Sequence, residues 1–196
     1  LHLSSAFVER PPAHRLWRSE AVRPDGDRTR DPGQWVAIDG PGKLQKVFYL
    51  AQGGLSDVPG PDTPVTVDTP QDCGTEAGEY FATDVGATLP RDQRPDDGLS
   101  VCFDTAPLDA DLDVIGVPIL RVPVTLDRPQ GMLVARLVDV HPDGTAHRVS
   151  LGVLNLSHRA GSAEPSPMEP GRTEDIALEL DVAAYRFKAG HRLRLA

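Results

Sequence analysis

Residues Ala135 to Arg159 read ARLVDVHPDGTAHRVSLGVLNLSHR, and this stretch decides the fold. From Met132 to His141 the side chains alternate as they do in a strand whose two faces differ. Pro142-Asp143-Gly144 follows and supplies turn chemistry, because Gly144 can take a positive φ. Apolar residues resume from Ala146 to Leu156. The stretch therefore predicts two antiparallel strands joined by a tight turn.

The alternation assigns the side chains of the first strand to two faces. One face carries Leu133, Ala135, Leu137 and Asp139. The other face carries Met132, Val134, Arg136, Val138 and Val140. The second face is thus mostly apolar, with Arg136 as its exception.

The rest of the chain carries further short strand patterns. They are Gln34–Ile38, Lys46–Leu50, Leu99–Phe103, Val117–Leu126, Thr173–Val182 and His191–Leu195. The 19 Pro and 18 Gly residues that punctuate the chain argue against a helical bundle. No internal repeat is evident, which disfavours a propeller or a solenoid. The sequence predicts an all-β protein with a β-sandwich or jelly-roll fold.

We expect a single domain over residues 1–196. Residues 1–69 form a loop-rich lead-in with the first strands, residues 70–98 form a long loop segment, and residues 99–196 form the main β region. Long aperiodic segments in compact domains are usually functional, interface-forming or disordered. The chain ends inside an apparent strand at Ala196, so we expect it to be part of a longer protein.

The charge balance argues against several classes of partner. The net charge is −9 and there are only three lysines, so the surface repels phosphate backbones and anionic lipid. No apolar run approaches the ~20 residues of a membrane span, and the first residues lack a signal-peptide pattern. We expect no nucleic-acid or membrane partner and a cytoplasmic location, unless an upstream segment carries a signal.

The sequence offers no catalytic residues. The Gly-x-Ser-x-Gly elbow of α/β-hydrolases is missing. Cys73 has acidic neighbours, which disfavour the reactive thiolate. Cys102 lies in an apolar pattern, which favours a buried thiol. A Cys73–Cys102 disulfide stays open, because it depends on an oxidising compartment.

Support for metals and cofactors is weak. The six histidines show neither His-x-x-x-His nor His-x-His spacing, so zinc is disfavoured. Asp109, Asp111 and Asp113 resemble part of a calcium loop, but no glutamate follows at the EF-hand position. We keep these three as weak calcium candidates beside the simpler interpretation of a solvated acidic turn. Phosphate and dinucleotide loops are absent, so no cofactor is expected.

Polar residues gather where the predicted strands begin or end. They are Asp139, Asp143, Asn155, His158, Arg159, His191 and Arg192. If these strand ends meet, the basic and amide groups would hydrogen-bond buried carbonyls and pair with the two aspartates. We interpret this cluster as a structural network and not as a catalytic site.

Several motifs, in their order along the chain, resemble one family. They are Phe103-Asp104-Thr105-Ala106-Pro107-Leu108, Ile115-Gly116, Asp139-Val140, Pro142-Asp143-Gly144, Gly152 to Arg159, Pro170-Gly171 and Gly190-His191-Arg192-Leu193-Arg194-Leu195. This order resembles the C-terminal domain of the X-Pro dipeptidyl-peptidase and cocaine-esterase type (CocE/NonD) hydrolases. The resemblance implies a jelly-roll β-sandwich of galactose-binding-like topology that packs against an α/β-hydrolase domain. It also implies that the Ser-Asp-His triad lies in that other domain, and no triad position maps onto this chain.

The resemblance favours a non-catalytic C-terminal domain of a serine acyl or peptidyl hydrolase. Such a domain would support the catalytic domain, shape the substrate entrance and contribute to self-association as a homo-oligomer, with residues 70–97 making the contacts. The alternative is a stand-alone carbohydrate-binding module, but only 5% of the residues are aromatic, and Trp17 and Trp35 are expected to pack. An autonomous hydrolase is the weakest alternative, because no triad is recognisable.

Overall fold

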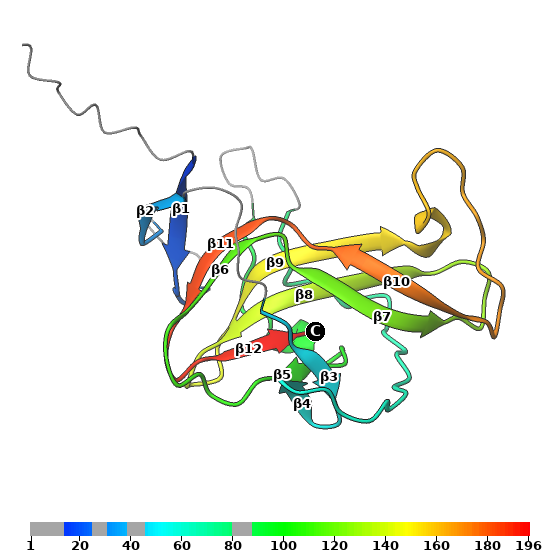
Figure 1. The fold of residues 1–196 in the computed structure, drawn as a ribbon, viewed down its shortest axis with the longest axis horizontal. Helices are drawn as coiled ribbons and strands as arrows, with labels where there is room; N and C mark the ends of the chain where they lie inside the picture. The colour runs from blue at the N-terminus through cyan, green and yellow to red at the C-terminus, as the bar shows by residue number, and fades with distance from the viewer. Residues whose placement is uncertain (1–13, 25–30, 39–45, 80–87) are drawn as a thin grey trace, which may run out of the picture.

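The computed structural model describes residues 14–24, 31–38, 46–79 and 88–196, and short strands dominate it (Figure 1). In chain order the strands are β1 (His14–Glu20), β2 (Gly33–Ile38), β3 (Tyr49–Ala51), β4 (Gly54–Ser56), β5 (Phe103–Asp104), β6 (Leu112–Gly116), β7 (Ile119–Thr125), β8 (Met132–Val140), β9 (Ala146–Asn155), β10 (Thr173–Glu179), β11 (Ala183–Phe187) and β12 (Arg192–Leu195). The helices among these residues are α1 (Arg94–Asp97) and the 3₁₀ helix η1 (Leu156–His158). In this part of the chain no helix has the length and apolar character needed to cross a membrane.

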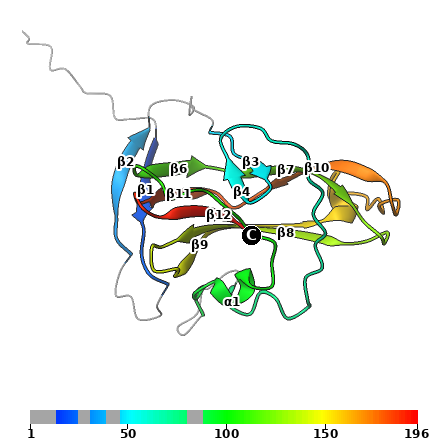
Figure 2. The ribbon, with the colours of Figure 1, turned by 90° about the horizontal axis from the view of Figure 1, so that it is seen from below.

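Two layers of strands face each other across one core (Figures 1 and 2). One layer is the sheet β5-β12-β8-β9, and the other comprises the sheet β2-β1-β11-β6 and the pair β10-β7. The main cluster of buried side chains comprises Ala135, Leu137, Leu178, Leu180, Tyr185, Phe187 and Leu193. The predicted all-β sandwich is confirmed, whereas the jelly-roll and galactose-binding-like topology stays a prediction.

Strands β6 and β7 run opposite β11 and β10 as one interrupted antiparallel ribbon. Ala183 pairs with Gly116, and Glu179 pairs with Ile119. The interruption falls at residues 117–118 and 180–182, directly after Gly116, whose φ of 134° suits a residue without a side chain. Because this interruption separates β10 from β11, the prediction of a single strand over Thr173–Val182 is wrong beyond Glu179.

Strands β8 and β9 form the hairpin predicted from the opening stretch. Gly144 has a φ of 86° in the turn, as its position in Pro142-Asp143-Gly144 requires. The turn is closed by the His141 amide, which donates to the Thr145 carbonyl at 2.8 Å. This hairpin is the longest paired unit of its layer and fixes the orientation of the polar groups described below.

The two faces of β8 are covered by different parts of the chain. Ala135 and Leu137 pack in the core between the layers. Val138 and Val140 pack with Ala146 in a separate cluster. The predicted assignment of these side chains to opposite faces is therefore confirmed.

Strand β1 lies in the loop-rich lead-in, before the first strand that the sequence predicts. It pairs with β2 along its length and runs parallel to β11 at Ser19 and Glu20. Its alternation is hidden because a charged residue, Arg18, points inward and donates to Asp113 Oδ2 at 2.8 Å. The prediction of a loop is wrong for residues 14–20.

Two other predicted strands are shorter or displaced. Over Leu99–Phe103 the strand prediction is wrong except at Phe103, because the amides of Leu99 and Ser100 instead donate to carbonyls of α1. The strand predicted over Lys46–Leu50 begins at Tyr49 and is paired with β4. Both errors fall next to turns, where short apolar runs carry little information on backbone pairing.

The described residues of the 70–98 segment form a cover on the outer side of the β8–β9 layer (Figure 2). Two parts of the segment lie side by side, because the Glu79 amide donates to Thr88 O at 2.8 Å. The segment then joins the sheet through the Gln93 amide, which donates to Ala146 O at 2.9 Å. Over its described residues the 70–98 segment is therefore held by hydrogen bonds and is not a free loop.

Candidate functional site

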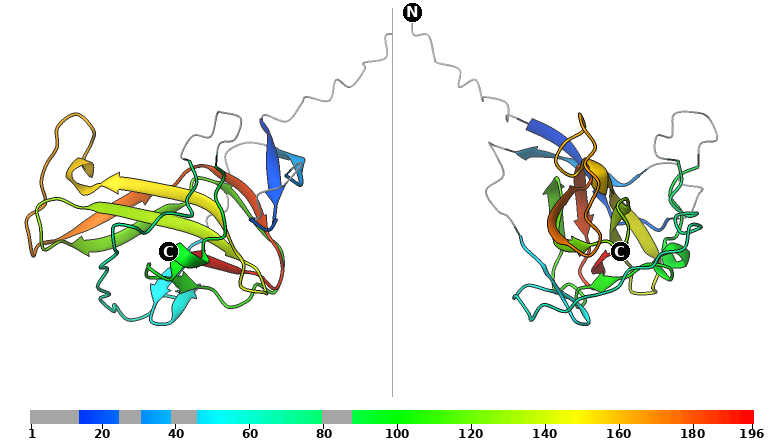
Figure 3. Two further views of the ribbon diagram at one scale, coloured as in Figure 1. Left: turned by 180° about the vertical axis from the view of Figure 1, so that it is seen from behind. Right: turned by 90° about the vertical axis from the view of Figure 1, so that its right-hand side faces the viewer.

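The polar residues predicted to cluster are divided between the two ends of the β8–β9 hairpin. In the hairpin Val140 lies opposite Ala146, whereas Met132 lies opposite Asn155. Asp139, Asp143, His191 and Arg192 are at the turn end; the far end holds Asn155, His158 and Arg159. These ends lie on opposite sides of the molecule (Figures 1 and 3). The prediction of a single network is therefore wrong, because the sequence indicates where strands end but not which strand ends lie close together.

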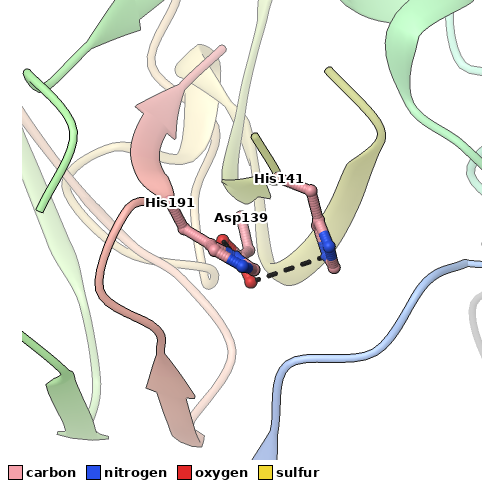
Figure 4. A group of neighbouring side chains, drawn as sticks. All are labelled: Asp139, His141 and His191. Atoms are coloured by element: carbon pink, nitrogen blue, oxygen red, sulfur yellow. Dashed lines mark hydrogen bonds and ion pairs between the residues drawn. The ribbon is translucent and has the colours of Figure 1, made fainter. Parts of the chain in front are cut away.

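Asp139 is a fully buried carboxylate near the end of β8 (Figure 4). The Tyr185 hydroxyl in β11 donates to Oδ2 at 2.8 Å, and Nδ1 of His191, just before β12, lies 2.9 Å from Oδ1. These contacts tie the two layers together at this end. They also compensate the carboxylate, whose burial would otherwise cost several kcal/mol (about 2–7 for an unpaired polar group).

His141, the first residue after β8, completes what we call the Asp139 group, defined as Asp139, His141, Tyr185 and His191. Its Nε2 lies 3.8 Å from Oδ2 of Asp139, and its ring centre lies 4.4 Å from that of His191. This Nε2 is buried and has no hydrogen-bond partner. Burial lowers the pKa of His141, although the Asp139 charge opposes the shift. The ring therefore favours its neutral form at neutral pH.

The Asp139 group has a carboxylate and a histidine in contact, as nucleophilic enzymes have, but it contains no serine, threonine or cysteine. Its hydroxyl belongs to Tyr185 and donates to the Asp139 carboxylate at 2.8 Å. Nucleophilic catalysis needs a hydroxyl or thiol within reach of the histidine that takes its proton. The contacts around Asp139 therefore provide no triad.

The donor atoms of the Asp139 group suit a metal ion better than they suit acyl transfer. Imidazole nitrogens and carboxylate oxygens are ligands of divalent transition metals. Asp139, His141 and His191 present one ligand atom each within 4.8 Å of one another, and no other such group occurs in the described ranges. The sequence gives no spacing signal for it, because the ligands come from two strands that meet only in the fold.

Asp143 and Arg192 lie at the same end but outside the Asp139 group. Asp143 accepts a hydrogen bond from the Thr145 amide and pairs with Arg23 at 2.6 Å. The Thr145 hydrogen bond is the main cause that lowers the pKa of Asp143. Arg192 donates to the Thr105 carbonyl at 2.9 Å. Both residues therefore hold loops in place.

The far end contains a separate structural arrangement. The Asn155 side chain accepts from the Ser157 amide at 3.0 Å and caps η1, which also contains His158. Arg159 forms a bidentate pair with Glu174, with distances of 2.6 and 3.0 Å. The hydrogen bond from Arg159 lowers the pKa of Glu174. These contacts fasten the end of β9 to β10.

The three calcium candidates do not converge on a cation site. Asp113 is paired with Arg186 and Arg18, and the hydrogen bond from Arg186 is the main cause that lowers its pKa. Asp111 accepts from the Ala189 amide and pairs with Lys188 at 3.4 Å. Asp109 is exposed. Basic side chains thus occupy the positions beside Asp111 and Asp113 that a calcium ion would need.

A buried charged network that the sequence does not predict lies on the outer face of β8. We call it the Arg136 network. Arg136 contacts Asp97 at 3.0 Å and also donates to Gln93 and Ser100 at 3.0 Å each. Arg194 bridges the same Asp97, at 2.9 Å, to Asp104. The signal in the sequence is the lone arginine on an apolar face, but its partners lie about 40 residues earlier.

Both cysteines lie beside members of the Arg136 network, and the structure has them as free thiols. Cys73 lies 3.6 Å from the Ser100 hydroxyl, and Cys102 donates to Asp97 O at 3.4 Å. Burial raises the pKa of the Cys102 thiol. The sequence leaves open whether Cys73 and Cys102 form a disulfide, and in the structure they do not.

The tryptophans are exposed, so the expectation that they pack is wrong. Trp35 is 68% exposed, and Trp17 meets it edge-on with ring centres 5.7 Å apart. A hollow of about 570 Å³ adjoins them, with Trp17, Ile115 and Val182 in its lining. Register explains the exposure, since Trp17 and Trp35 are opposite each other in the outermost strand pair of the sheet.

Comparison with protein families gives one match over nearly the whole chain. The profile of the X-Pro dipeptidyl-peptidase C-terminal non-catalytic domain matches residues 7–196. Cocaine esterase from Rhodococcus sp. (strain MB1 Bresler) is 27% identical over 186 residues, which cover 85% of this chain and 31% of that protein. The chain thus spans about a third of the length of this relative.

Solved structures share the fold. An α-amino acid ester hydrolase labelled with selenomethionine superposes with a TM-score of 0.65 at 24% identity, over 83% of this chain and 31% of that one. An aminopeptidase from the marine sediment archaeon Thaumarchaeota archaeon gives a TM-score of 0.54 at 20% identity, over 94% of this chain and 29% of that one. At these identities the likeness establishes the fold alone.

Proposed function

Because the chain belongs to the family of X-Pro dipeptidyl-peptidase C-terminal non-catalytic domains, we propose that it is the non-catalytic C-terminal domain of a serine hydrolase of the esterase, acylase or dipeptidyl-peptidase type. In this proposal it docks on a catalytic α/β-hydrolase domain elsewhere in the same protein and supports it. The family match over residues 7–196 carries the proposal. The composition of the Asp139 group, which has no serine, threonine or cysteine, supports it.

The surface that best fits the catalytic domain is the tryptophan patch, which we define as Trp17, Trp35, Ile115 and Val182. Val182 is 76% exposed, and the other three side chains are also exposed. Clusters of exposed large apolar side chains mark interaction sites in soluble proteins. The adjoining hollow gives this surface a concave part that a protruding side chain of the catalytic domain would fill.

Self-association is assigned to a different surface, the outer face of β8 and β9 beyond α1. Met132, Val134 and Val153 are exposed there, and Val134 lies directly opposite Val153. The 70–98 segment borders this surface. Its Gln93, Asp97 and Asp96 side chains bond within the domain, so only its outward residues are free for contacts with another domain or subunit.

Two matched variants of the whole protein distinguish the roles of the two surfaces. Trp35→Asp should lower the ester-hydrolysis rate and the unfolding midpoint of the catalytic domain, and leave the sedimentation coefficient unchanged. Val134→Asp is the matched apolar-to-acidic control and should change sedimentation alone. Full activity and an unchanged midpoint in Trp35→Asp would contradict docking through the tryptophan patch.

The substrate entrance is a finer part of the same proposal. If the rim of the hollow borders the entrance, Trp17→Ala should raise KM for bulky esters with little effect on kcat, because it removes binding that is equal in ground and transition states. If Trp17→Ala has the same KM as the native protein for bulky esters as well as for small ones, this part of the proposal is wrong.

A carbohydrate-binding module is the second candidate, and the exposure of Trp35 is the observation that favours it. Sugar rings stack on exposed indole faces, although the edge-on pairing of Trp17 and Trp35 gives no flat platform. A glycan array followed by calorimetry tests it. Binding that is lost in Trp35→Ala supports a sugar site, and an array without hits rejects it.

A further inference from the structure

The Asp139 group contains one buried ring nitrogen that makes no hydrogen bond, Nε2 of His141. Asp139 receives the Tyr185 hydroxyl at 2.8 Å and faces His191 Nδ1 at 2.9 Å. Nε2 of His141 points at the same carboxylate but stops 3.8 Å from Oδ2, beyond the reach of a hydrogen bond at about 2.7–3.2 Å. A buried nitrogen without a partner forfeits the hydrogen bond that it makes to water in the unfolded chain.

A cation between the three side chains removes this deficit. Zinc binds nitrogen and oxygen at about 2.0–2.2 Å, so two ligands of one ion lie about 3–4 Å apart. The 3.8 Å between His141 and Asp139 falls in that range. The full set of ligand atoms lies within 4.8 Å, so the ligands that lie farthest apart move closer together when they bind one ion.

We propose that Asp139, His141 and His191 bind a divalent transition-metal ion, for which Zn²⁺ is the probe that fits the donors. Two imidazoles select against Mg²⁺ and Ca²⁺, which prefer oxygen ligands. Tyr185 holds the carboxylate from behind, as outer hydrogen bonds do in metal sites. Exposures of 10% for His141 and 12% for His191 leave a path for the ion from solvent.

The bound ion would connect three places in the chain that otherwise meet through two hydrogen bonds. His141 belongs to the β8–β9 turn, His191 precedes β12, and Tyr185 anchors Asp139 to β11 of the other layer. An ion that binds only the folded chain stabilises it by mass action. The site therefore acts as a clamp on the end of the sandwich that carries the turn.

The test is a Zn²⁺ titration of the EDTA-treated chain by calorimetry. We expect one ion per chain and a loss of affinity of at least about 100-fold in His141→Ala and in His191→Ala. Tyr185→Phe keeps all three ligands and should weaken binding about 10-fold. At a hundredfold excess over Kd, Zn²⁺ should raise Tm by about 5–10 °C in the native chain and not in His141→Ala.

His158→Ala is the matched control, because His158 is a histidine of η1 at the opposite end of the hairpin. It should bind Zn²⁺ as the native chain does. No binding by the native chain, or equal binding by His141→Ala and His158→Ala, would overturn the proposal. If His191→Ala fails to fold, as circular dichroism would show, His141→Ala decides, since His141 lies in the turn outside the strands.

Discussion

Strand β8 buries two charged side chains, Arg136 and Asp139, and the two differ in how completely they are paired. Arg136 meets Asp97, Gln93 and Ser100, all at 3.0 Å. Asp139 is paired with Tyr185 and His191, but leaves His141 Nε2 beside it without a hydrogen bond. Each region contains one buried atom without a hydrogen bond, Asp97 Oδ1 in the Arg136 network and His141 Nε2 in the Asp139 group. Asp97 Oδ1 still forms an ion pair with Arg136 at 3.0 Å, whereas His141 Nε2 stays 3.8 Å from Asp139. The comparison teaches that the Arg136 network serves stability, whereas the Asp139 group has a ring nitrogen that can serve binding.

The largest effect should follow from opening the Arg136 network. Arg136→Met leaves Gln93 Oε1 and Asp97 Oδ1 without the guanidinium, and removing one member of a buried pair costs about 3–5 kcal/mol. Urea denaturation measures the loss. Arg128→Met, at an exposed arginine, is the control and should change the free energy of unfolding by less than about 0.5 kcal/mol. A loss below about 1 kcal/mol in Arg136→Met would break the comparison.

A smaller effect should follow from Asp139→Asn in EDTA. The amide keeps the shape but has one acceptor oxygen, so either Tyr185 or His191 loses its acceptor. We expect a loss of about 2 kcal/mol in the same urea assay. A loss as large as that of Arg136→Met would mean that the Asp139 group is as tightly locked as the Arg136 network.

The Asp139 group should also make the free energy of unfolding depend on pH, through His141. Burial lowers the pKa of His141, with His191 and Arg23 acting in the same direction and Asp139 and Asp143 opposing them. A lowered histidine pKa gives stability that is present above the ordinary value of about 6.5 and is lost as pH falls below it. In EDTA the free energy of unfolding should therefore fall between about pH 7 and 5, and His141→Gln should flatten the fall. An unchanged slope in His141→Gln would contradict the assignment.

The smallest effect should come from Asp143, which lies four residues from Asp139 but on the exposed turn. Asp143→Ala removes the Arg23 pair and the hydrogen bond to the Thr145 amide. Because both contacts are open to solvent, Tm should stay within about 2 °C of the native value. Zn²⁺ binding should be unchanged, which a calorimetric titration checks.

The sequence was sufficient for the parts of the fold that depend on local pattern. Alternation from Met132 to His141 and the turn at Gly144 predicted the β8–β9 hairpin and the side of the sheet on which each residue lies. It was not sufficient for β1, where the inward Arg18 is paired with an aspartate about 95 residues away. An ion pair that forms only in the fold has no periodic signal.

The candidate site could be predicted in part. Asp139 and His191 were expected in one polar cluster because each lies at a strand end, and the structure does bring them together. The strand-end criterion omits His141 and wrongly includes Asn155, His158 and Arg159. Both errors have one cause: the hairpin register, which decides which ends are neighbours, is a tertiary property.

The most direct test of the proposal that this chain is a non-catalytic domain without an acyl-transfer centre is ester hydrolysis by the purified chain alone. The assay follows p-nitrophenyl acetate in EDTA, with and without a serine-directed inhibitor. The account predicts the rate of buffer in both cases. Turnover above that rate that the inhibitor abolishes would contradict it.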